Sequence, residues 1–279
     1  MPTYSRRTFL KNSALIAGLA RVPSLLFGNS KTPKFPDQPN IILIITDQER
    51  YSQWFPHDWE QNNLPNMQRL KANGLSFTNA FCNTSMCTPS RATLLTGLFP
   101  TQHGVVDTLP ECEGKQNPQN YTVLDPAHQN LAWMLKSAGY QVFYKGKWHL
   151  SYPESDEWTS EDIAKYGFDE WNPPDGGEDT ASENYGGGRA NLDEHYLQDT
   201  LDFLENVDTS KPFALIVSFI NPHDVAGFPN DYDQDYPAGM LEGDLELPPT
   251  IDEDLDRNYK PHTHAETLNK LGLGLDVLA

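Results

Sequence analysis

Asn40-Ile41-Ile42-Leu43-Ile44-Ile45-Thr46-Asp47 is a short apolar run, rich in β-branched residues, that ends in polar ones. Its length and composition predict a parallel strand that is buried on both faces. Residues 140–144 and 213–220 predict two further strands. Functional groups gather at the carboxyl ends of strands in open α/β sheets. Asp47 and Gln48 therefore stand where a site is expected.

Amphipathic segments alternate with these strands. Helices are predicted at residues 65–73, from 92–95 onward after Pro89, at 130–138 and at 195–206. In the last of these helices, Leu197, Leu201 and Leu204 form the expected core stripe. Strands that alternate with helices predict an α/β fold with a largely parallel sheet and helices on both faces.

Composition limits the classes of function. The chain has 279 residues, with 20 basic and 39 acidic residues and a net charge of -19. A general nucleic-acid binder would carry a basic surface, so we expect no nucleic-acid partner. Residues 151–190 are rich in Gly, Pro, Asp and Glu, and we expect them to form a long excursion that shapes a substrate pocket.

The N-terminus has the pattern of a targeting segment. Arg6 and Arg7 precede Phe9 and Leu10, and a short apolar run follows. This pattern resembles a twin-arginine signal, and the alternative is a chance basic start of a disordered tail. We expect residues 1–36 to be a signal peptide and linker recognised by the twin-arginine export machinery. The protein would then be periplasmic or secreted.

Cys87-Thr88-Pro89-Ser90-Arg91, followed by a small apolar run and Thr96-Gly97, is the most specific motif. A buried thiol beside a proline turn is the alternative interpretation of Cys87 alone. The whole stretch resembles the sulfatase signature of the alkaline phosphatase superfamily. The resemblance implies that a maturation enzyme oxidises Cys87 to Cα-formylglycine. One hydroxyl of the hydrated aldehyde would attack sulfur, and the other would later expel sulfate.

The same resemblance implies a metal site and further catalytic residues. Asp47, Gln48 and the modified Cys87 would bind one calcium ion, which prefers hard oxygen ligands. Without the motif, Asp47 would equally suit a helix N-cap. Many sulfatases have two aspartates where this chain has Asp47-Gln48. The Asp-Gln variant also occurs in related phosphonate monoester hydrolases.

Two later segments match the family in order. Gly146-Lys147-Trp148-His149-Leu150 implies that Lys147 holds a sulfate oxygen and that His149 is the base for sulfate release. Asn221-Pro222-His223-Asp224 makes His223 the expected general acid. Arg91 would orient the diol. The alternatives are a solvated loop for the Lys-x-His pair and a structural role for His223.

The resemblance extends from about Asn40 to about Pro249. We find no counterpart of the family's later metal-binding pair, of its second sulfate-binding lysine or of its C-terminal antiparallel subdomain before Ala279. We therefore expect residues 37–279 to be an incomplete catalytic domain, truncated at its C-terminus. Weak calcium binding and an exposed sheet edge would follow.

Three functions remain open. The first is hydrolysis of a sulfate monoester of a small molecule or a saccharide. The second is cleavage of phosphonate or phosphate esters with the same nucleophile. The third is an inactive fragment that only binds anions.

Overall fold

The computed structural model describes residues 37–51, 58–110, 121–155, 157–176, 192–223 and 254. The expected signal segment and the third cysteine, Cys112, lie outside these residues, as do residues 156 and 177–190 of the excursion. In the described part of the chain, no helix is long and apolar enough to cross a membrane.

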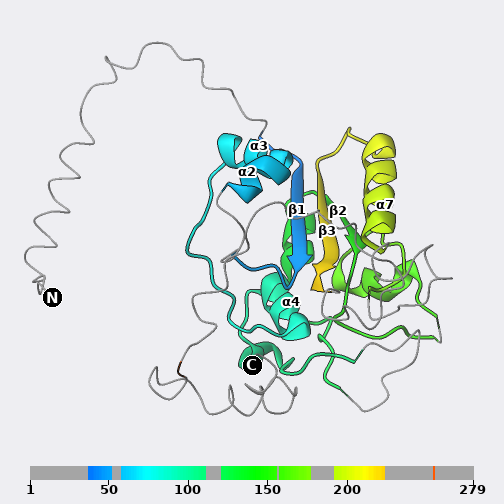
Figure 1. Ribbon diagram of the computed structural model, residues 1–279. Helices are drawn as coiled ribbons and strands as arrows, with labels where there is room; N and C mark the ends of the chain where they lie inside the picture. Colours follow the sequence, from blue (N-terminus) through cyan, green and yellow to red (C-terminus); the bar gives the residue numbers. More distant parts are fainter. Residues whose placement is uncertain are drawn as a thin grey trace, which may run out of the picture. The chain divides into compact units, whose positions relative to one another are not determined.

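In the part of the chain that the structure describes, three parallel strands form a sheet in the order β1-β3-β2 (Figure 1). They are β1 (Ile41–Asp47), β2 (Gln141–Gly146) and β3 (Phe213–Pro222), so all three predicted strands are confirmed. The register pairs Asp47 with Pro222 and Gly146 with Ser218. The carboxyl ends of the three strands therefore meet at one edge of the sheet.

The helices are α2 (Trp59–Asn63), α3 (Pro65–Asn73), α4 (Cys87–Thr96), α5 (Pro100–His103), α6 (Leu131–Ser137) and α7 (Leu192–Asn206), with a 3-10 helix η1 (Ser160–Tyr166). The four predicted helices are present, but α4 begins at Cys87, ahead of the apolar stretch that indicated it. Pro89 is compatible with this start because the first turn of a helix needs no N–H partner at that position.

Helices cover both faces of the sheet at β2 and β3, as predicted. On one face, α4 and α6 pack through Ala92, Leu95 and Ala132 against Tyr144 and Ile216. On the other face, Phe203 of α7 packs on Phe143, with ring centroids 4.6 Å apart. The two apolar layers hold β3 in the centre and fix the strand ends that carry the site.

The predicted core stripe of α7 is wrong. Leu197, Leu201 and Leu204 are 46%, 45% and 38% exposed. The buried residues of the helix are Leu192, Tyr196 and Thr200, which repeat every four residues, and Tyr196 and Thr200 directly precede Leu197 and Leu201. The two stripes are adjacent on the helix surface, and leucine content alone favoured the wrong one. The aromatic ring of Tyr196 and the close approach of α7 to β3 decide the actual orientation.

The prediction that β1 is buried on both faces is also wrong. Ile42 and Ile44 are 48% and 59% exposed, whereas Leu43 and Ile45 pack against the α4–α6 side. In the described part of the chain β1 is an edge strand, and α7 lies over β2 and β3. An exposed apolar strand at a sheet edge favours association with other chains.

Gly146 is the residue at which β2 turns into the site, and we expect Gly146→Ala to be strongly destabilising. Its φ is +92°, and a Cβ would lie 2.1 Å from the carbonyl oxygen of Ser218. We expect a loss of about 3 kcal/mol or more in the free energy of unfolding, measured by urea denaturation.

Gly97→Ala is the matched control for this substitution. Gly97 has a φ of +71° and no atom within 4 Å of an added Cβ, so only the backbone penalty applies. That penalty is about 1–2 kcal/mol. Equal losses in the two variants would contradict the steric role of Gly146.

Candidate active site

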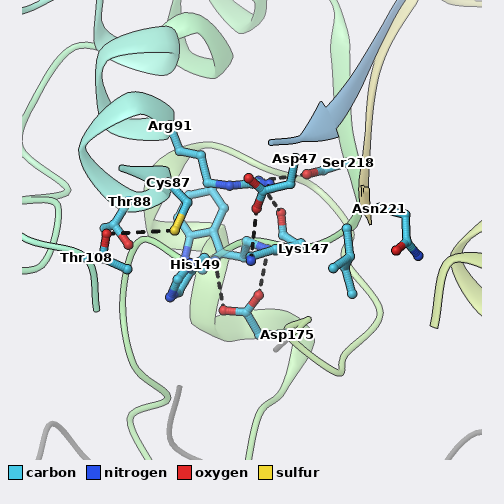
Figure 2. A network of polar contacts seen from close by, with 12 residues as sticks. Asp47, Cys87, Thr88, Arg91, Thr108, Lys147, His149, Asp175, Ser218 and Asn221 are labelled. Atoms are coloured by element: carbon cyan, nitrogen blue, oxygen red, sulfur yellow. Dashed lines mark hydrogen bonds and ion pairs between the residues drawn. The ribbon is translucent and has the colours of Figure 1, made fainter. Parts of the chain in front are cut away.

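The carboxyl edge of the sheet brings together residues that are far apart in the sequence (Figure 2). Asp47 is the last residue of β1, and Lys147 and His149 directly follow β2. Cys87 is the first residue of α4, and Arg91 lies one helical turn later. His223 directly follows β3. Four of the seven elements that the sequence indicated, β1, β2, β3 and α4, thus end or begin at one place.

Asp47 forms two buried ion pairs. Its Oδ2 atom lies 2.9 Å from Lys147 Nζ and 3.3 Å from Arg91 Nη2. Burial alone would raise the pKa of the carboxyl group, but the charges of Lys147 and Arg91 outweigh burial and hold the pKa below its usual value. Buried charges are stable only when they are paired, so these three side chains depend on one another.

Arg91 also contacts β3 and the residue that directly follows β2. Its Nη1 atom donates to the carbonyl oxygen of Lys147 at 2.8 Å and to Ser218 Oγ at 2.7 Å. The guanidinium is planar and presents its donors in a fixed fork, so the three contacts define the position of α4 above the sheet. Cys87, at the start of the same helix, is positioned by them.

Residues 108 and 109 link Cys87 to His149. The Cys87 sulfur lies 3.8 Å from Thr108 Oγ1, and Thr88 Oγ1 accepts a hydrogen bond from the N–H of Leu109 at 3.1 Å. The Leu109 carbonyl in turn lies 2.7 Å from His149 Nε2. The half-buried thiol and the buried imidazole therefore bind to two consecutive residues of one segment.

His149 is held as a neutral imidazole. Burial, followed by the nearby charge of Lys147, lowers its pKa to about 3. A carbonyl can only accept, so Nε2 carries the proton that binds Leu109. Nδ1 is then an unprotonated acceptor, and it is buried without a hydrogen-bond partner in the described structure. Such an atom is suited to accept a proton from a group that enters the site.

Two of the predicted site residues, Gln48 and His223, are not buried. Gln48 is exposed, with a φ of +64°, and makes no recorded polar contact among the described residues. His223 is half-buried, and its charge is among those that lower the pKa of Asp47. His223 therefore lies within electrostatic range of the cluster.

The sequence analysis missed Asp175. Its carboxylate oxygens accept hydrogen bonds from the N–H groups of Trp148 and His149 at 2.7 and 2.8 Å. Although part of the residue is exposed, the surrounding protein desolvates the carboxyl group and raises its pKa to about 6. The Pro-Pro-Asp-Gly-Gly context of Asp175 is typical of a turn and contains no signal of this contact.

The described residues do not complete a calcium site. Calcium takes about six to eight oxygen ligands. No group of three or more His, Cys, Asp or Glu side chains suited to a metal occurs in the described part of the chain. Asp47 is the one predicted ligand that is buried and charged, and two cations already contact it. The cluster as described is better suited to an anion.

Known proteins resemble this chain in sequence. Human N-acetylgalactosamine-6-sulfatase is 31% identical over 207 residues, which cover 64% of this chain and 38% of that protein. Bacteroides thetaiotaomicron N-acetylglucosamine-6-O-sulfatase is 29% identical over 196 residues, covering 67% and 31%. Bovine arylsulfatase A is 37% identical over 112 residues, covering 40% and 21%. The chain thus spans roughly two fifths or less of the length of these relatives.

The state of His149 predicts how stability depends on pH. The unfolded chain takes up a proton on this residue near pH 6.5, whereas the folded chain does so near pH 3. Stability is therefore lost as the pH falls from 6.5 toward 3. His149→Gln keeps an N–H donor and cannot titrate, so the loss between pH 7 and pH 5 should shrink by about 1–2 kcal/mol.

Urea denaturation at a series of pH values measures this difference. His195→Gln, at an exposed position of α7, is the control and should leave the slope unchanged. Parallel curves for wild type and His149→Gln would show that His149 has no depressed pKa in the folded state.

The fold and the family agree with this geometry. A solved 2-O GAG sulfatase superposes with a TM-score of 0.51 and 24% identity, over 77% of this chain and 42% of that one, which supports the alkaline phosphatase-like α/β fold. Residues 39–256 match the sulfatase family as a whole. This match covers the strands, the Cys87 helix and the Lys147–His149 turn, and the chain belongs to the sulfatase family.

Proposed function

We propose that this chain carries the nucleophile and the anion-binding part of an enzyme that hydrolyses sulfate esters, with Cys87 converted to formylglycine. One observation carries the proposal. Cys87 begins a helix whose next turn places Arg91 against both Asp47 and the Lys147 carbonyl. The position for the nucleophile is thereby fixed beside two buried cations.

The surroundings of Cys87 suit a hydrated aldehyde. The thiol is half-buried beside the Thr108 hydroxyl, and His149 supplies a buried acceptor, Nδ1, with no partner in the described structure. When present, the aldehyde hydrate supplies one hydroxyl to attack sulfur and a second whose deprotonation releases sulfate. His149 is neutral near pH 7, so it can take that second proton.

The two cations and His223 have separate roles in the proposal. Lys147 and Arg91 stabilise the negative charge on the sulfate oxygens in the transition state. The bond between sulfur and the ester oxygen breaks, and His223 protonates that oxygen as the alcohol leaves. Asp47 keeps both cations in place by pairing with them.

The relatives favour a saccharide substrate. Two of them are named for removal of a 6-sulfate from N-acetylgalactosamine and N-acetylglucosamine. We infer that the substrate is a sulfated saccharide and that the excursion after Leu150 contributes to its recognition. A maturation enzyme that forms formylglycine and the twin-arginine export machinery are the expected partners, and the mature protein would be periplasmic or secreted.

Members of the family generally use calcium, and we propose that Asp47 and Gln48 contribute to such a site. The modified Cys87 would be a third ligand. The remaining oxygen ligands would come from outside the described residues, because those residues do not complete the site. Bound calcium would polarise the sulfate group.

Two alternatives remain. The Asp47-Gln48 pair keeps open a phosphonate or phosphate ester hydrolase with the same nucleophile. The incomplete metal site keeps open an inactive fragment that binds anions. Both alternatives share the fold and differ from the main proposal in what the purified chain does to a substrate.

Cys87→Ala tests the covalent mechanism. The chain is expressed together with a formylglycine-generating enzyme and assayed on paired aryl sulfate and aryl phosphonate esters. We expect sulfate cleavage to fall about a thousandfold or more, because the nucleophile is lost. Cys82→Ala removes an exposed free cysteine five positions earlier and should have no effect.

Mass spectrometry of the peptide that contains residue 87 separates the outcomes. Conversion of the thiol to an aldehyde with activity on the sulfate ester supports the proposal. A larger rate on the phosphonate ester supports the first alternative. An unmodified thiol, or modification without activity on either ester, supports the inactive fragment. Undiminished activity in Cys87→Ala would exclude the covalent mechanism.

Asp47 and Gln48 alone should bind calcium weakly, so calcium should have little effect on the stability of the protein. A site with a dissociation constant above about 1 mM, at about 1 mM calcium, stabilises by no more than about 0.4 kcal/mol. We expect a rise of about 2 °C or less in Tm by differential scanning fluorimetry. A rise of several degrees that Asp47→Asn abolishes would show that this chain completes the site by itself.

A further inference from the structure

The turn after β2 directs three consecutive side chains to three different places. Lys147 Nζ pairs with Asp47, and the His149 ring binds the Leu109 carbonyl. Trp148 between them is fully buried, and its Nε1–H donates to Ser151 Oγ at 2.8 Å. Two residues of the proposed mechanism therefore share one short piece of backbone, and its conformation decides where both of them point.

This backbone is anchored from several sides. The N–H of Lys147 donates to the Ser218 carbonyl at 2.9 Å. The Lys147 carbonyl accepts from Arg91 Nη1 at 2.8 Å and from the Tyr144 hydroxyl at 2.7 Å. The next two N–H groups, of Trp148 and His149, both bind the carboxylate of Asp175. Asp175 is thus their common partner.

We infer that Asp175 is the positioning residue of the site: its carboxylate holds the Trp148–His149 backbone in the conformation that directs Lys147 to Asp47 and His149 toward the Cys87 side. This role depends on the proposed function, because Lys147 and His149 act there on the substrate. No motif in the sequence pointed to Asp175, which lies at the end of the described excursion, 26 residues after His149.

A carboxylate is needed because both of its oxygens are used. Oδ1 accepts from Trp148 and Oδ2 from His149. An amide side chain has one acceptor and one donor, so Asn would turn an N–H toward one of the two backbone N–H groups. Both of those groups belong to buried residues, and a buried donor without a partner is strongly unfavourable.

The conformation at His149 needs this support. Its φ is +52°, in the left-handed region that residues other than glycine rarely occupy. Such a conformation persists where surrounding contacts fix it. The two hydrogen bonds to Asp175, together with the Leu109 contact, supply that restraint. Without the carboxylate we expect the turn to relax, and the Lys147 and His149 side chains to move together.

Asp175→Asn tests this inference, and Asp162→Asn is its matched control. Asp162 is another buried carboxylate of the same excursion, and its oxygens accept from the N–H groups of Glu154 and Thr159 at 2.9 and 2.7 Å. Among the described residues, its hydrogen bonds go to Glu154 and Thr159 and to none of the proposed site residues. Both substitutions should lower stability, but only Asp175→Asn should disturb the site.

Two readouts separate positioning from general damage. The first is the ring nitrogen chemical shifts of His149 in protein labelled with 15N-histidine, assigned by comparison with His149→Gln. These shifts should change in Asp175→Asn and stay as in wild type in Asp162→Asn. The second is aryl sulfate hydrolysis by the matured chain, in which Asp175→Asn should lower kcat by about 10- to 100-fold more than the control does.

The outcomes distinguish this inference from the proposed function. Wild-type protein without activity argues against the proposed function, while the histidine shifts still test the role of Asp175. Wild-type shifts in folded Asp175→Asn would overturn the inference. If Asp175→Asn does not fold, Asp175→Glu keeps the charge and displaces the oxygens. Altered His149 shifts in the folded Glu variant support the inference, and unchanged shifts overturn it.

Discussion

The buried guanidinium of Arg91 is the interaction on which the rest of the site depends. It binds Asp47 at the end of β1, the Lys147 carbonyl after β2 and Ser218 of β3, so one side chain connects α4 to all three strands. The sheet register brings those three partners to the same edge. Because Cys87 lies one helical turn before Arg91, the same contacts position the residue that the proposal makes the nucleophile. Loss of Arg91 would leave a buried carboxylate paired only with Lys147, and would free the start of the helix.

The buried charged side chains of the site are stable because their opposite charges compensate one another. Lys147 and Arg91 carry positive charge, and Asp47 and Asp175 compensate for it from opposite sides of the turn. His149 lies in the same field and remains neutral, which leaves its Nδ1 atom able to accept a proton. Protonated His149 would add a third positive charge to the cluster and weaken the Lys147–Asp47 pair. In the proposed mechanism, the groups that would hold the sulfate are therefore distinct from the group that would move a proton.

Local spacing made much of this site predictable. The strand ends were readable because continuous β-branched runs stop at polar residues, as at Asp47. Five consecutive residues from Cys87 to Arg91 carried the resemblance to the sulfatase signature, although the helix was predicted only from residue 92 onward and begins at Cys87. Two kinds of feature could not be predicted from the sequence. The buried face of α7 depends on tertiary packing, which selected Tyr196 over the neighbouring leucines. Asp175 binds the backbone N–H of His149, 26 residues earlier, and every residue except proline has such an N–H, so no residue type in the sequence indicates this contact.

The described part of the chain builds one half of the site more fully than the other. The proposed anion-binding half uses β2, β3 and α4, whose faces are covered, and its side chains have defined partners. The proposed metal-binding half would depend on β1, whose Ile42 and Ile44 face is exposed, and on Gln48, which is exposed as well. Asp47 belongs to both halves, and here it is paired with cations. A calcium ion at Asp47 would have to compete with Lys147 and Arg91 for the same oxygens. Additional oxygen ligands would shift that competition toward the ion, because each adds favourable contacts that the two side-chain cations cannot replace.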